Sequence, residues 1–584
     1  MTAPPYLPSI VRPGLLLFLL VALPAACGAD DRPSVLLITV DTLRADAVGV
    51  YGNSGARTPR MDRLAAAGIR FERAKSTCPI TLPSHLTILT GVTPPEHGIR
   101  DNDPERPLPG PDFRDFATLA ERFRKEGYAT AAFVSASVVA KRTGLDAGFT
   151  VYDGPTGSVP GSLVYAERTG EKTAAHAADW MAAADRPFFV WVHLFDPHDP
   201  YVPPVAFRSG AAPDSPEAYA DEVAYADHCV GAVLDAIEGT DTLVVLTSDH
   251  GEGLGEHEES THAFLLYETT LAVPLVISRP GHLAEGEARP DVVGLADLAP
   301  TILDAAGIED DERSFLDGPT QRIPVAETLY GYRHMGWAQL VCAWDGETKL
   351  VEGAPDAWFD LAADPREANP LSTGPERLRE RIRAYRTTPL RVGKSPSESL
   401  EPLAGHAYLS GVGRGRLAFL SVAENRKLLP PDGRRVDEIG RLFGRVGRDD
   451  PAAVGRALRH RMDEDPKNPS LPFWLGRNEK AAGRYADAAR AFGRSFELGH
   501  REARVLALWL QSLILSEQIE EGLAIGTEMV TQIVPDTAVW VMLGTLQMQS
   551  GKHDTAVRSA EKAARLARSE RERKLVSSFR HKLR

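Results

Sequence analysis

The chain has 584 residues, of which 43% are hydrophobic and 25% are charged, and it contains 4 cysteines. These values are ordinary for a globular protein, and they exclude a largely disordered chain, a fibrous protein and a disulfide scaffold. The length predicts several domains, and the formal net charge of −14 argues against binding of nucleic-acid phosphates by the chain as a whole.

The amino terminus carries a targeting pattern. Arg12 precedes the apolar run Leu15 to Leu23, and small residues follow it up to Cys27. This order is typical of a secretory signal, and the run is too short to cross a bilayer, which needs about 20 residues. We expect residues 1–27 to be a signal peptide of the lipoprotein type, with a lipid anchor on Cys27. Cleavage with release and an uncleaved anchor are the alternatives, and each places the protein in the periplasm or cell envelope.

Residues 34–385 alternate apolar runs with helical patterns. The helical patterns span 59–67, 116–127 and 223–237. The predicted strands are Val35 to Val40, Ala129 to Val134, Phe188 to Leu194, Leu243 to Thr247 and Pro274 to Ile277. Continuous apolar strands are typical of a parallel sheet that is covered on both faces. The alternation predicts a doubly wound α/β fold with its functional site beyond the carboxyl ends of the strands.

The sequence after this region changes character. Residues 386–445 mix proline, glycine and arginine clusters, and we interpret them as a linker. Within 446–584 a pattern recurs, because Leu475-Gly476 matches Leu543-Gly544 at a distance of 68 residues, or two periods of 34. The period resembles that of tetratricopeptide repeats, which implies a groove for an unidentified peptide or protein partner. A plain helical bundle is the alternative.

Four polar segments mark a candidate site. They are, in chain order, Asp41 to Arg44, Thr81 to Gly91, His193 to Tyr201 and Ser248 to His257. Each one alone also fits a helix cap or a turn. Their joint occurrence, in this order and on the ends of predicted strands, is much harder to obtain by chance.

This set of segments resembles the sulfatase branch of the alkaline-phosphatase superfamily. Further motifs fit the same family, namely Thr58-Pro59 through Phe71, Asp297 to Asp304 and Phe359 to Pro365. The resemblance covers about residues 34–375. It implies a metal-assisted hydrolase of sulfate or phosphate esters that forms a covalent intermediate.

The sequence departs from that family at the nucleophile. Sulfatases carry Cys or Ser, any residue, Pro, any residue and Arg, and the first of these residues becomes formylglycine. Here Thr81 and His85 stand at the two ends of that pattern, and Cys78 does not fit it because Pro79 follows at once. Threonine cannot become formylglycine, so water must attack the sulfur or phosphorus of the intermediate. This chemistry favours a phosphorus ester over a sulfate ester.

The resemblance also implies a metal site and its surroundings. Asp41, Asp249, His250 and the oxygen of Thr81 are the expected ligands. Because an imidazole replaces an oxygen ligand of standard sulfatases, zinc or manganese is favoured, with calcium as the alternative.

Other side chains are candidates for contact with the substrate. His198 and His262 could assist the leaving group, or could join Asp196 around a second metal. His85 and Asn102 are candidate substrate-binding residues, although Asn102 also fits a turn. Weaker candidates for supporting roles complete the set, namely His97, His257, His334, Glu252 and Glu256.

Three functions remain open at this point. The first is an exported, metal-dependent, sulfatase-like hydrolase acting on a small, glycan-linked or lipid-linked anionic ester through Thr81. The second is an envelope transferase that moves a phosphorus-containing group onto a glycan. The third is an inactive fold that serves as a platform for the helical repeats.

Overall fold

The computed structural model describes residues 32–102, 116–155, 166–310, 314–316, 318, 322–389, 419–533, 535–567 and 570–583. The predicted signal peptide with Cys27 and a large part of the predicted linker lie outside the described residues. Cys78, Cys229 and Cys342 are buried and unpaired. Within the described ranges, no helix combines the length and the apolar character that a membrane span requires.

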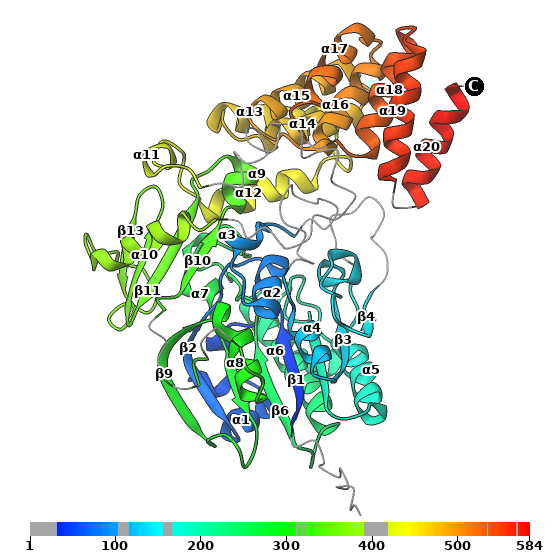
Figure 1. Ribbon diagram of the computed structural model, residues 1–584. Helices are drawn as coiled ribbons and strands as arrows, with labels where there is room; N and C mark the ends of the chain where they lie inside the picture. Colours follow the sequence, from blue (N-terminus) through cyan, green and yellow to red (C-terminus); the bar gives the residue numbers. More distant parts are fainter. Residues whose placement is uncertain are drawn as a thin grey trace, which may run out of the picture. The chain divides into compact units, whose positions relative to one another are not determined.

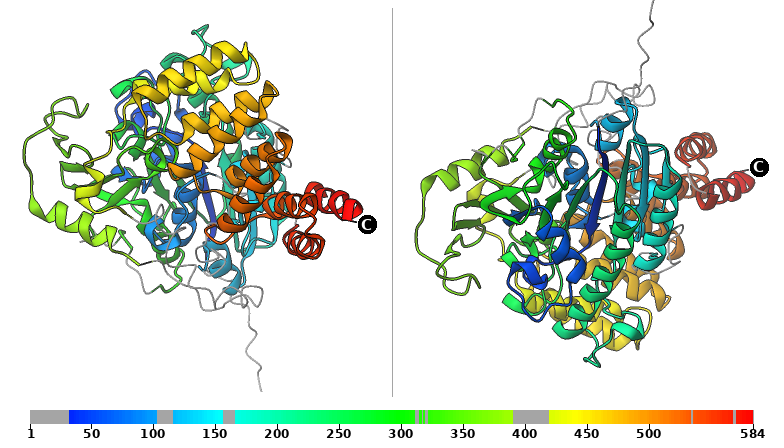
Figure 2. Two further views of the ribbon diagram at one scale, coloured as in Figure 1. Left: turned by 90° about the horizontal axis from the view of Figure 1, so that it is seen from above. Right: turned by 90° about the horizontal axis from the view of Figure 1, so that it is seen from below.

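A mixed sheet of nine strands forms the centre of the α/β region, in the order β4-β3-β5-β1-β6-β8-β2-β7, with β9 beside β2. The strands from β4 to β6 are mutually parallel, whereas β8 is antiparallel to both β6 and β2. Figure 2 shows β1, in dark blue, with strands on both of its sides. The strands are β1 (Ser34–Val40), β2 (Ile69–Lys75), β3 (Ala129–Val134), β4 (Val151–Asp153), β5 (Phe188–Leu194), β6 (Thr242–Thr247), β7 (Ala272–Val273), β8 (Leu275–Ser278) and β9 (Glu287–Gly294).

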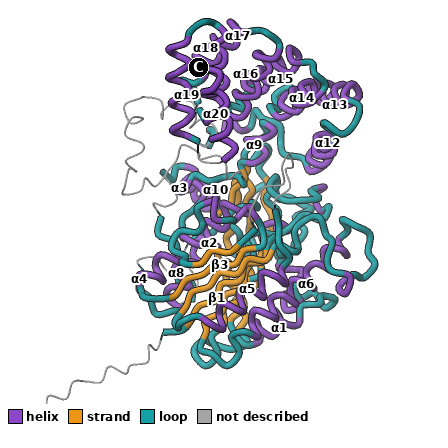
Figure 3. Tube along the Cα trace, turned by 90° about the vertical axis from the view of Figure 1, so that its right-hand side faces the viewer, coloured by secondary structure: helices purple, strands orange, loops and turns teal. Residues whose placement is uncertain are grey.

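Helices cover both faces of this sheet, as Figure 3 shows. Val35 and Leu37 of β1 pack into a core with α2, α4 and α8, whereas Leu36 and Ile38 pack into a second core with α1, α5 and α6. Burial on both faces explains the continuous apolar run of β1. The predicted doubly wound α/β fold is confirmed, with a sheet that is mixed. The helices are α1 (Pro59–Ala66), α2 (Thr81–Thr90), α4 (Leu119–Lys125), α5 (Gly170–Ala183), α6 (Pro216–Asp235) and α8 (Leu298–Ala305).

A second, antiparallel sheet follows the first one in the chain and was not expected from the sequence. Leu378, Ile382 and Tyr385 of α10 (Glu376–Arg386) pack on one of its faces. Its strands are only four to six residues long, and three of them mix apolar with polar residues. The remaining strand contains the apolar run Leu340 to Trp344, which was not recognised as a strand. The strands are β10 (Val325–Thr328), β11 (Leu340–Asp345), β12 (Thr348–Glu352) and β13 (Ala357–Asp360).

A buried ion network joins the two sheets. Lys349 of β12 places its Nζ 2.7 Å from Glu367 and 3.1 Å from Glu268, which also forms an ion pair with Lys75 of β2. The indole N–H of Trp344 donates to the same Glu268 carboxylate at 2.8 Å. Although burial raises the pKa of Glu268, the charges of Lys75 and Lys349 bring it below its ordinary value. Glu268 is therefore the shared anion of two buried ammonium groups.

We expect Glu268→Gln to lower the free energy of unfolding of the full chain by about 3–5 kcal/mol, because it leaves two buried cations with one carboxylate. Chemical denaturation followed by circular dichroism measures this loss. The control is Glu347→Gln, which removes an exposed carboxylate paired with Arg73 and should cost less than about 1 kcal/mol. Equal losses for both variants would contradict the assigned role of Glu268.

The chain from residue 451 onward is all-helical in its described part, which confirms the predicted α-helical region. Each helix packs against the next, and α16 also packs on α18. Helices α14, α16 and α18 begin at Ser470, Ala503 and Thr537, close to a period of about 34 residues. Figure 1 shows them in orange to red. The helices are α13 (Pro451–Glu464), α14 (Ser470–Ala481), α15 (Tyr485–Glu497), α16 (Ala503–Leu515), α17 (Ile519–Met529), α18 (Thr537–Gln549), α19 (His553–Leu566) and α20 (Glu570–Leu583).

The interpretation of 386–445 as a linker needs correction for its described carboxyl part. Residues 422–444 contain α11 (Val422–Asn425) and the amphipathic helix α12 (Gly433–Gly444). Val436, Ile439 and Leu442 of α12 are buried in a core that also contains residues of the second sheet. Their spacing of three residues places them on one helix face, a signal that the neighbouring proline, glycine and arginine residues obscured.

Candidate active site

The predicted metal ligands come together at the carboxyl ends of two adjacent strands. Asp41 follows β1, and Asp249 and His250 follow β6, which pairs with β1 in parallel. Each of the three residues offers one ligand atom, and these atoms lie within 4.8 Å of one another. All three side chains are completely buried. The sheet topology therefore brings together residues that are more than 200 positions apart in the chain.

Hydrogen bonds fix one carboxylate oxygen of Asp249, and the other oxygen is available to a metal ion. Oδ1 of Asp249 accepts the backbone N–H groups of His250 at 2.9 Å and of Thr42 at 3.3 Å. Among the described residues its Oδ2 has no hydrogen-bond partner, and it lies 3.4 Å from both Nε2 of His250 and Nδ1 of His85. Thr42 reaches this contact with φ at +54°, a left-handed conformation that is strained for a β-branched residue. The hydrogen bond that holds the Asp249 carboxylate is therefore made by a residue with a strained backbone conformation.

Asp41 and His250 present their remaining donor atoms to the same point. Oδ1 of Asp41 has no hydrogen-bond partner in the part of the chain that the structure describes, and it lies 4.0 Å from Nε2 of His250. Nδ1 of His250 lies 2.9 Å from the carbonyl oxygen of Gly251, so this nitrogen carries the proton and Nε2 presents its lone pair. Two open carboxylate oxygens and one imidazole lone pair therefore converge, and this donor set fits a divalent cation.

The charges at this point favour a cation. Burial raises the pKa of Asp41 and of Asp249, and the negative charge of Asp41 raises that of Asp249 further. Burial, followed by the charge of His262, lowers the pKa of His250 to about 4, so its imidazole is neutral at pH 7. Two buried carboxylates without a nearby cation repel each other, and a bound divalent ion removes that repulsion.

Thr81 begins helix α2 beside these ligands. Its Oγ lies 3.4 Å from Nε2 of His250 and 3.5 Å from Nδ2 of Asn102, which donates to it. Oδ1 of Asn102 accepts the backbone N–H of Leu82 at 2.8 Å, so Asn102 is fixed against the start of α2. The helix N-terminus favours negative charge on the Thr81 oxygen.

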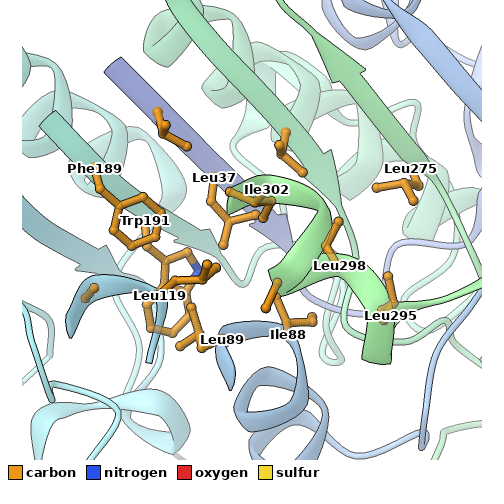
Figure 4. Packing of buried hydrophobic residues seen from close by; sticks show 14 of the residues in the cluster. Leu37, Ile88, Leu89, Leu119, Phe189, Trp191, Leu275, Leu295, Leu298 and Ile302 are labelled. Carbon is orange, nitrogen blue, oxygen red and sulfur yellow. The ribbon is translucent and has the colours of Figure 1, made fainter. Parts of the chain in front are cut away.

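The body of α2 is anchored in the core. Ile88 and Leu89 pack with Leu298 and Ile302 of α8, as Figure 4 shows. All ten residues of α2 are buried. Buried side chains in a close-packed core leave little freedom for the helix, so the position of the Thr81 oxygen is fixed by packing far from it.

His85 lies one turn after Thr81 in α2 and is completely buried, and its Nδ1 lies 3.4 Å from Oδ2 of Asp249. Its contact with the substrate stays a prediction. Its Nδ1 donates to the carbonyl oxygen of Thr81 at 2.8 Å, and its Nε2 accepts from the hydroxyl of Thr39 at 3.1 Å. The indole N–H of Trp191 donates to the same hydroxyl at 2.9 Å. Because both ring nitrogens are engaged inside the protein, His85 orients the first turn of α2.

His198 and His262 are half-buried, next to the buried ligands. The ring centre of His262 lies 4.5 Å from that of His250 and 5.2 Å from that of His198. Nδ1 of His262 lies 3.0 Å from Glu252, and burial lowers the pKa of His262 to about 4. Asp196 accepts the backbone N–H of Gly170 at 2.9 Å and thereby holds the start of α5. The two histidines are thus placed beside the buried ligands, as expected for groups that meet a substrate.

His193 begins the third candidate segment, but the sequence assigned it no role. Its Nε2 lies 3.3 Å from Oδ2 of Asp41, and its side chain is completely buried. It pairs in register with Thr39 on the neighbouring strand β1. The available signal was a single titratable residue near the carboxyl end of an otherwise apolar strand.

A chain of contacts leads from the nucleophile to the helical region. Oδ1 of Asp101 accepts the backbone N–H of Asn102 at 2.8 Å, and its Oδ2 lies 2.7 Å from Nε2 of His334. His334 belongs to α9 (Tyr330–Met335), and its carbonyl oxygen accepts the hydroxyl of Ser470, the first residue of α14. Helix α9 therefore lies between the Thr81 site and α14.

Comparison with known proteins agrees with this architecture. Residues 33–308 match the family model described as Sulfatase. The chain is 25% identical over 421 residues to a sulfatase of Formosa agariphila, a match that covers 58% of this chain and 82% of that protein. It is 26% identical over 365 residues to the N-acetylgalactosamine-6-sulfatase of Canis lupus familiaris, covering 52% of this chain and 68% of that protein.

The fold has a counterpart among solved structures. A 2-O GAG sulfatase superposes with a TM-score of 0.50 at 21% identity, covering 61% of this chain and 91% of that chain. At this identity the likeness concerns the fold. Together with the family match, it shows that residues 33–308 resemble sulfatases in sequence and in fold, which supports a sulfatase-like ester hydrolase.

Proposed function

We propose that this chain is a metal-dependent hydrolase that cleaves a sulfate or phosphorus ester through a covalent intermediate on Thr81. The observation that carries the proposal is the convergence of Asp41 Oδ1, Asp249 Oδ2 and His250 Nε2 beside the Thr81 hydroxyl, which lies 3.4 Å from that nitrogen. Relatives named as sulfatases support the reaction class. A relative named for a sugar sulfate supports a glycan-linked ester as the substrate.

Asp41, Asp249 and His250 would hold the metal, together with the oxygen of Thr81. The mixed set of oxygen and nitrogen donors favours zinc or manganese, and calcium is the alternative. When bound, the ion would supply Lewis-acid polarisation of the ester and stabilise the alkoxide form of Thr81.

The residues around the proposed metal site have separate roles in the reaction. The oxygen of Thr81 attacks sulfur or phosphorus, and Asn102 and the α2 N-terminus hold that oxygen in place. His262, whose Nδ1 lies 3.0 Å from Glu252, or His198 beside it assists the departing oxygen. Water then attacks the central atom of the intermediate. Because Thr81 lacks the second hydroxyl of a formylglycine hydrate, we favour phosphorus over sulfur as that atom.

A panel of substrates and metals tests the proposal. The full chain is offered 4-nitrophenyl sulfate, the corresponding phosphate monoester and diester, and an aryl phosphonate ester, each with calcium, manganese or zinc. We expect turnover of at least one phosphorus ester with zinc or manganese. Turnover of the sulfate alone would overturn the phosphorus preference. Failure to turn over any ester, with no metal retained, would support an inactive platform instead.

Two further features of the chain are proposals of the same kind. Residues 1–27 have the pattern of an export signal with a lipid-anchoring Cys27, so we propose a location in the cell envelope. The start of α14, α16 and α18 at intervals close to 34 residues supports tetratricopeptide-like repeats.

Replacing Asn102 with alanine should lower kcat about 100-fold with a much smaller change in KM, because it removes a donor held on the Thr81 oxygen. Steady-state kinetics on the ester of the panel with the highest kcat/KM measures the changes in kcat and in KM separately. Asn53→Ala is the control, because Asn53 is exposed and donates to a loop carbonyl. A rise in KM with an unchanged kcat would show that Asn102 serves only ground-state binding.

A further inference from the structure

Three cations gather on helices α14 and α16. Arg477 and Lys480 of α14 are half-buried, and Arg504, the second residue of α16, is exposed. The guanidinium carbon of Arg477 lies 4.6 Å from the ring centre of Trp474, and that of Arg504 lies 5.8 Å from the ring centre of Phe473. We call this set of five residues the cationic face.

The three cations of this face differ from other arginines of the same helical region. Arg459 pairs with Glu479 at 3.1 Å, Arg494 pairs with Glu497 at 3.3 Å, and Arg461 pairs with Glu464 at 2.6 Å. In the part of the chain that the structure describes, Arg477, Lys480 and Arg504 form no ion pair with a carboxylate. The cationic face therefore presents charge that the protein itself does not neutralise.

The cations of the face repel one another. Burial lowers the pKa of Arg477, and the charge of Arg504 lowers it further. Burial likewise lowers the pKa of Lys480, and the charge of Arg477 adds to this effect. Like charges held together without counter-charge raise the free energy of the folded helices, and a bound anion relieves this repulsion. The chain carries a net charge of −14, so this face is a local exception to its overall sign.

The cationic face continues the side of α14 that lies next to the candidate active site. Ser470, Trp474 and Arg477 follow one another at spacings of four and three residues and share one side of the helix. At the start of this side, Ser470 donates to the carbonyl oxygen of His334, whose ring contacts Asp101. Seven residues of α-helix separate Ser470 from Arg477, which corresponds to about 10 Å along the axis.

We propose that the cationic face binds anionic groups of a polyanionic glycan, one of whose ester groups is presented to Thr81. This proposal rests on the proposed function for the nature of the substrate. Guanidinium groups match the oxygens of sulfate and phosphate through paired hydrogen bonds. The charges occupy one turn of α14 and extend onto α16, an arrangement that suits a chain with repeated charges better than a single anion.

Binding is tested without turnover by isothermal titration of the full chain. The probes are dextran oligosaccharides of one length, either sulfated, phosphorylated or unmodified, and a poly-glutamate peptide of similar charge. We expect the sulfated or the phosphorylated oligosaccharide to bind, with affinity falling as salt rises, and the comparison between them identifies the anionic group. The unmodified oligosaccharide should not bind.

The matched variants are Arg477→Ala/Lys480→Ala/Arg504→Ala and the control Arg461→Ala/Arg490→Ala/Arg494→Ala, which removes the same charge from paired arginines. We expect at least 10-fold weaker binding for the first and less than 2-fold for the second. The single variant Arg477→Lys, which keeps the charge but loses the paired hydrogen bonds, should bind less tightly than the wild type and more tightly than the first triple variant. Equal binding by the two triple variants, absence of binding by the wild type, or tighter binding of poly-glutamate would overturn the proposal.

Kinetics separates this proposal from the proposed function. The first triple variant should hydrolyse a small aryl ester with unchanged kcat and KM, because the cationic face does not touch Thr81 or the metal ligands. If the wild type hydrolyses no ester but binds the charged oligosaccharide through the cationic face, the proposed function fails and the docking surface stands.

Discussion

Replacing Thr81 with alanine should reduce kcat/KM by at least about 10⁴-fold on whichever ester the chain hydrolyses, because the attacking oxygen is lost. The effect is expected to be this large because the surrounding groups are arranged for that one atom: Asn102 donates to it and Nε2 of His250 lies 3.4 Å away. Steady-state kinetics with the metal-loaded protein measures the loss, and the metal content of the variant should remain stoichiometric.

Two controls separate chemistry from folding. Thr81→Ser keeps the hydroxyl and should stay within about 10-fold of the wild type. Thr87→Ala removes a buried hydroxyl from the same helix, where it donates to the carbonyl of Pro83, and should leave kcat within about 3-fold. Mass spectrometry of the quenched reaction should find the transferred group on the peptide that contains Thr81. A Thr81→Ala variant with full activity would refute the nucleophile assignment.

The elements that the sequence predicted best are those whose burial is uniform along the chain. The bounds of β3 and β5 coincide with the predicted apolar runs, because both faces of these strands are covered. Strand β2, with the sequence IRFERAK, was missed because charged residues interrupt it and no apolar run marks it. The second sheet was missed because its strands are short and three of them are partly polar, although β11 contains the apolar run Leu340 to Trp344.

The candidate site was predictable in its residues and less so in their roles. Asp41, Thr81, Asp249 and His250 stand at strand ends or at the start of a helix, and parallel strands bring such positions together. The inward orientation of His85 depends on Thr39, 46 residues away, and the contact of Asp101 with His334 spans 233 residues. Such pairings follow from tertiary packing, and the local periodicity of a sequence carries no information about them.

Replacing Asp249 with asparagine should abolish stoichiometric metal binding and lower turnover by at least about 10³-fold, because the site loses a charged ligand and the metal it holds. Elemental analysis of the purified protein and kinetics with added zinc or manganese measure the two effects. Asp304→Asn, which changes an exposed carboxylate on α8, should bind metal as the wild type does. Full metal content in Asp249→Asn would remove Asp249 from the ligand set.

Removal of the metal should reverse the order of stability of the wild type and Asp249→Asn. In the metal-free wild type, Asp41 and Asp249 are buried carboxylates that repel each other, and the pKa of each is raised. Asparagine removes one of the two charges while keeping the shape of the side chain, so metal-free Asp249→Asn should melt at a higher temperature than the metal-free wild type. With metal present the order should be opposite, because only the wild type gains the binding free energy of the ion.

The dependence on pH follows from the sign of these shifts. A carboxyl whose pKa is raised by folding binds more protons in the folded than in the unfolded chain, so stability falls as the pH rises above the unfolded value of about 4. The metal-free wild type should therefore lose stability relative to metal-free Asp249→Asn from about pH 4 upward until both carboxyls are ionised, a comparison in which the shared buried histidines cancel. Metal affinity should rise over the same range, because the ion binds the deprotonated carboxylates. Melting curves of the chelated and metal-loaded wild type and Asp249→Asn across this range measure both trends. A difference between the two chelated proteins that does not grow with rising pH would show that the two carboxylates do not repel each other in the folded protein.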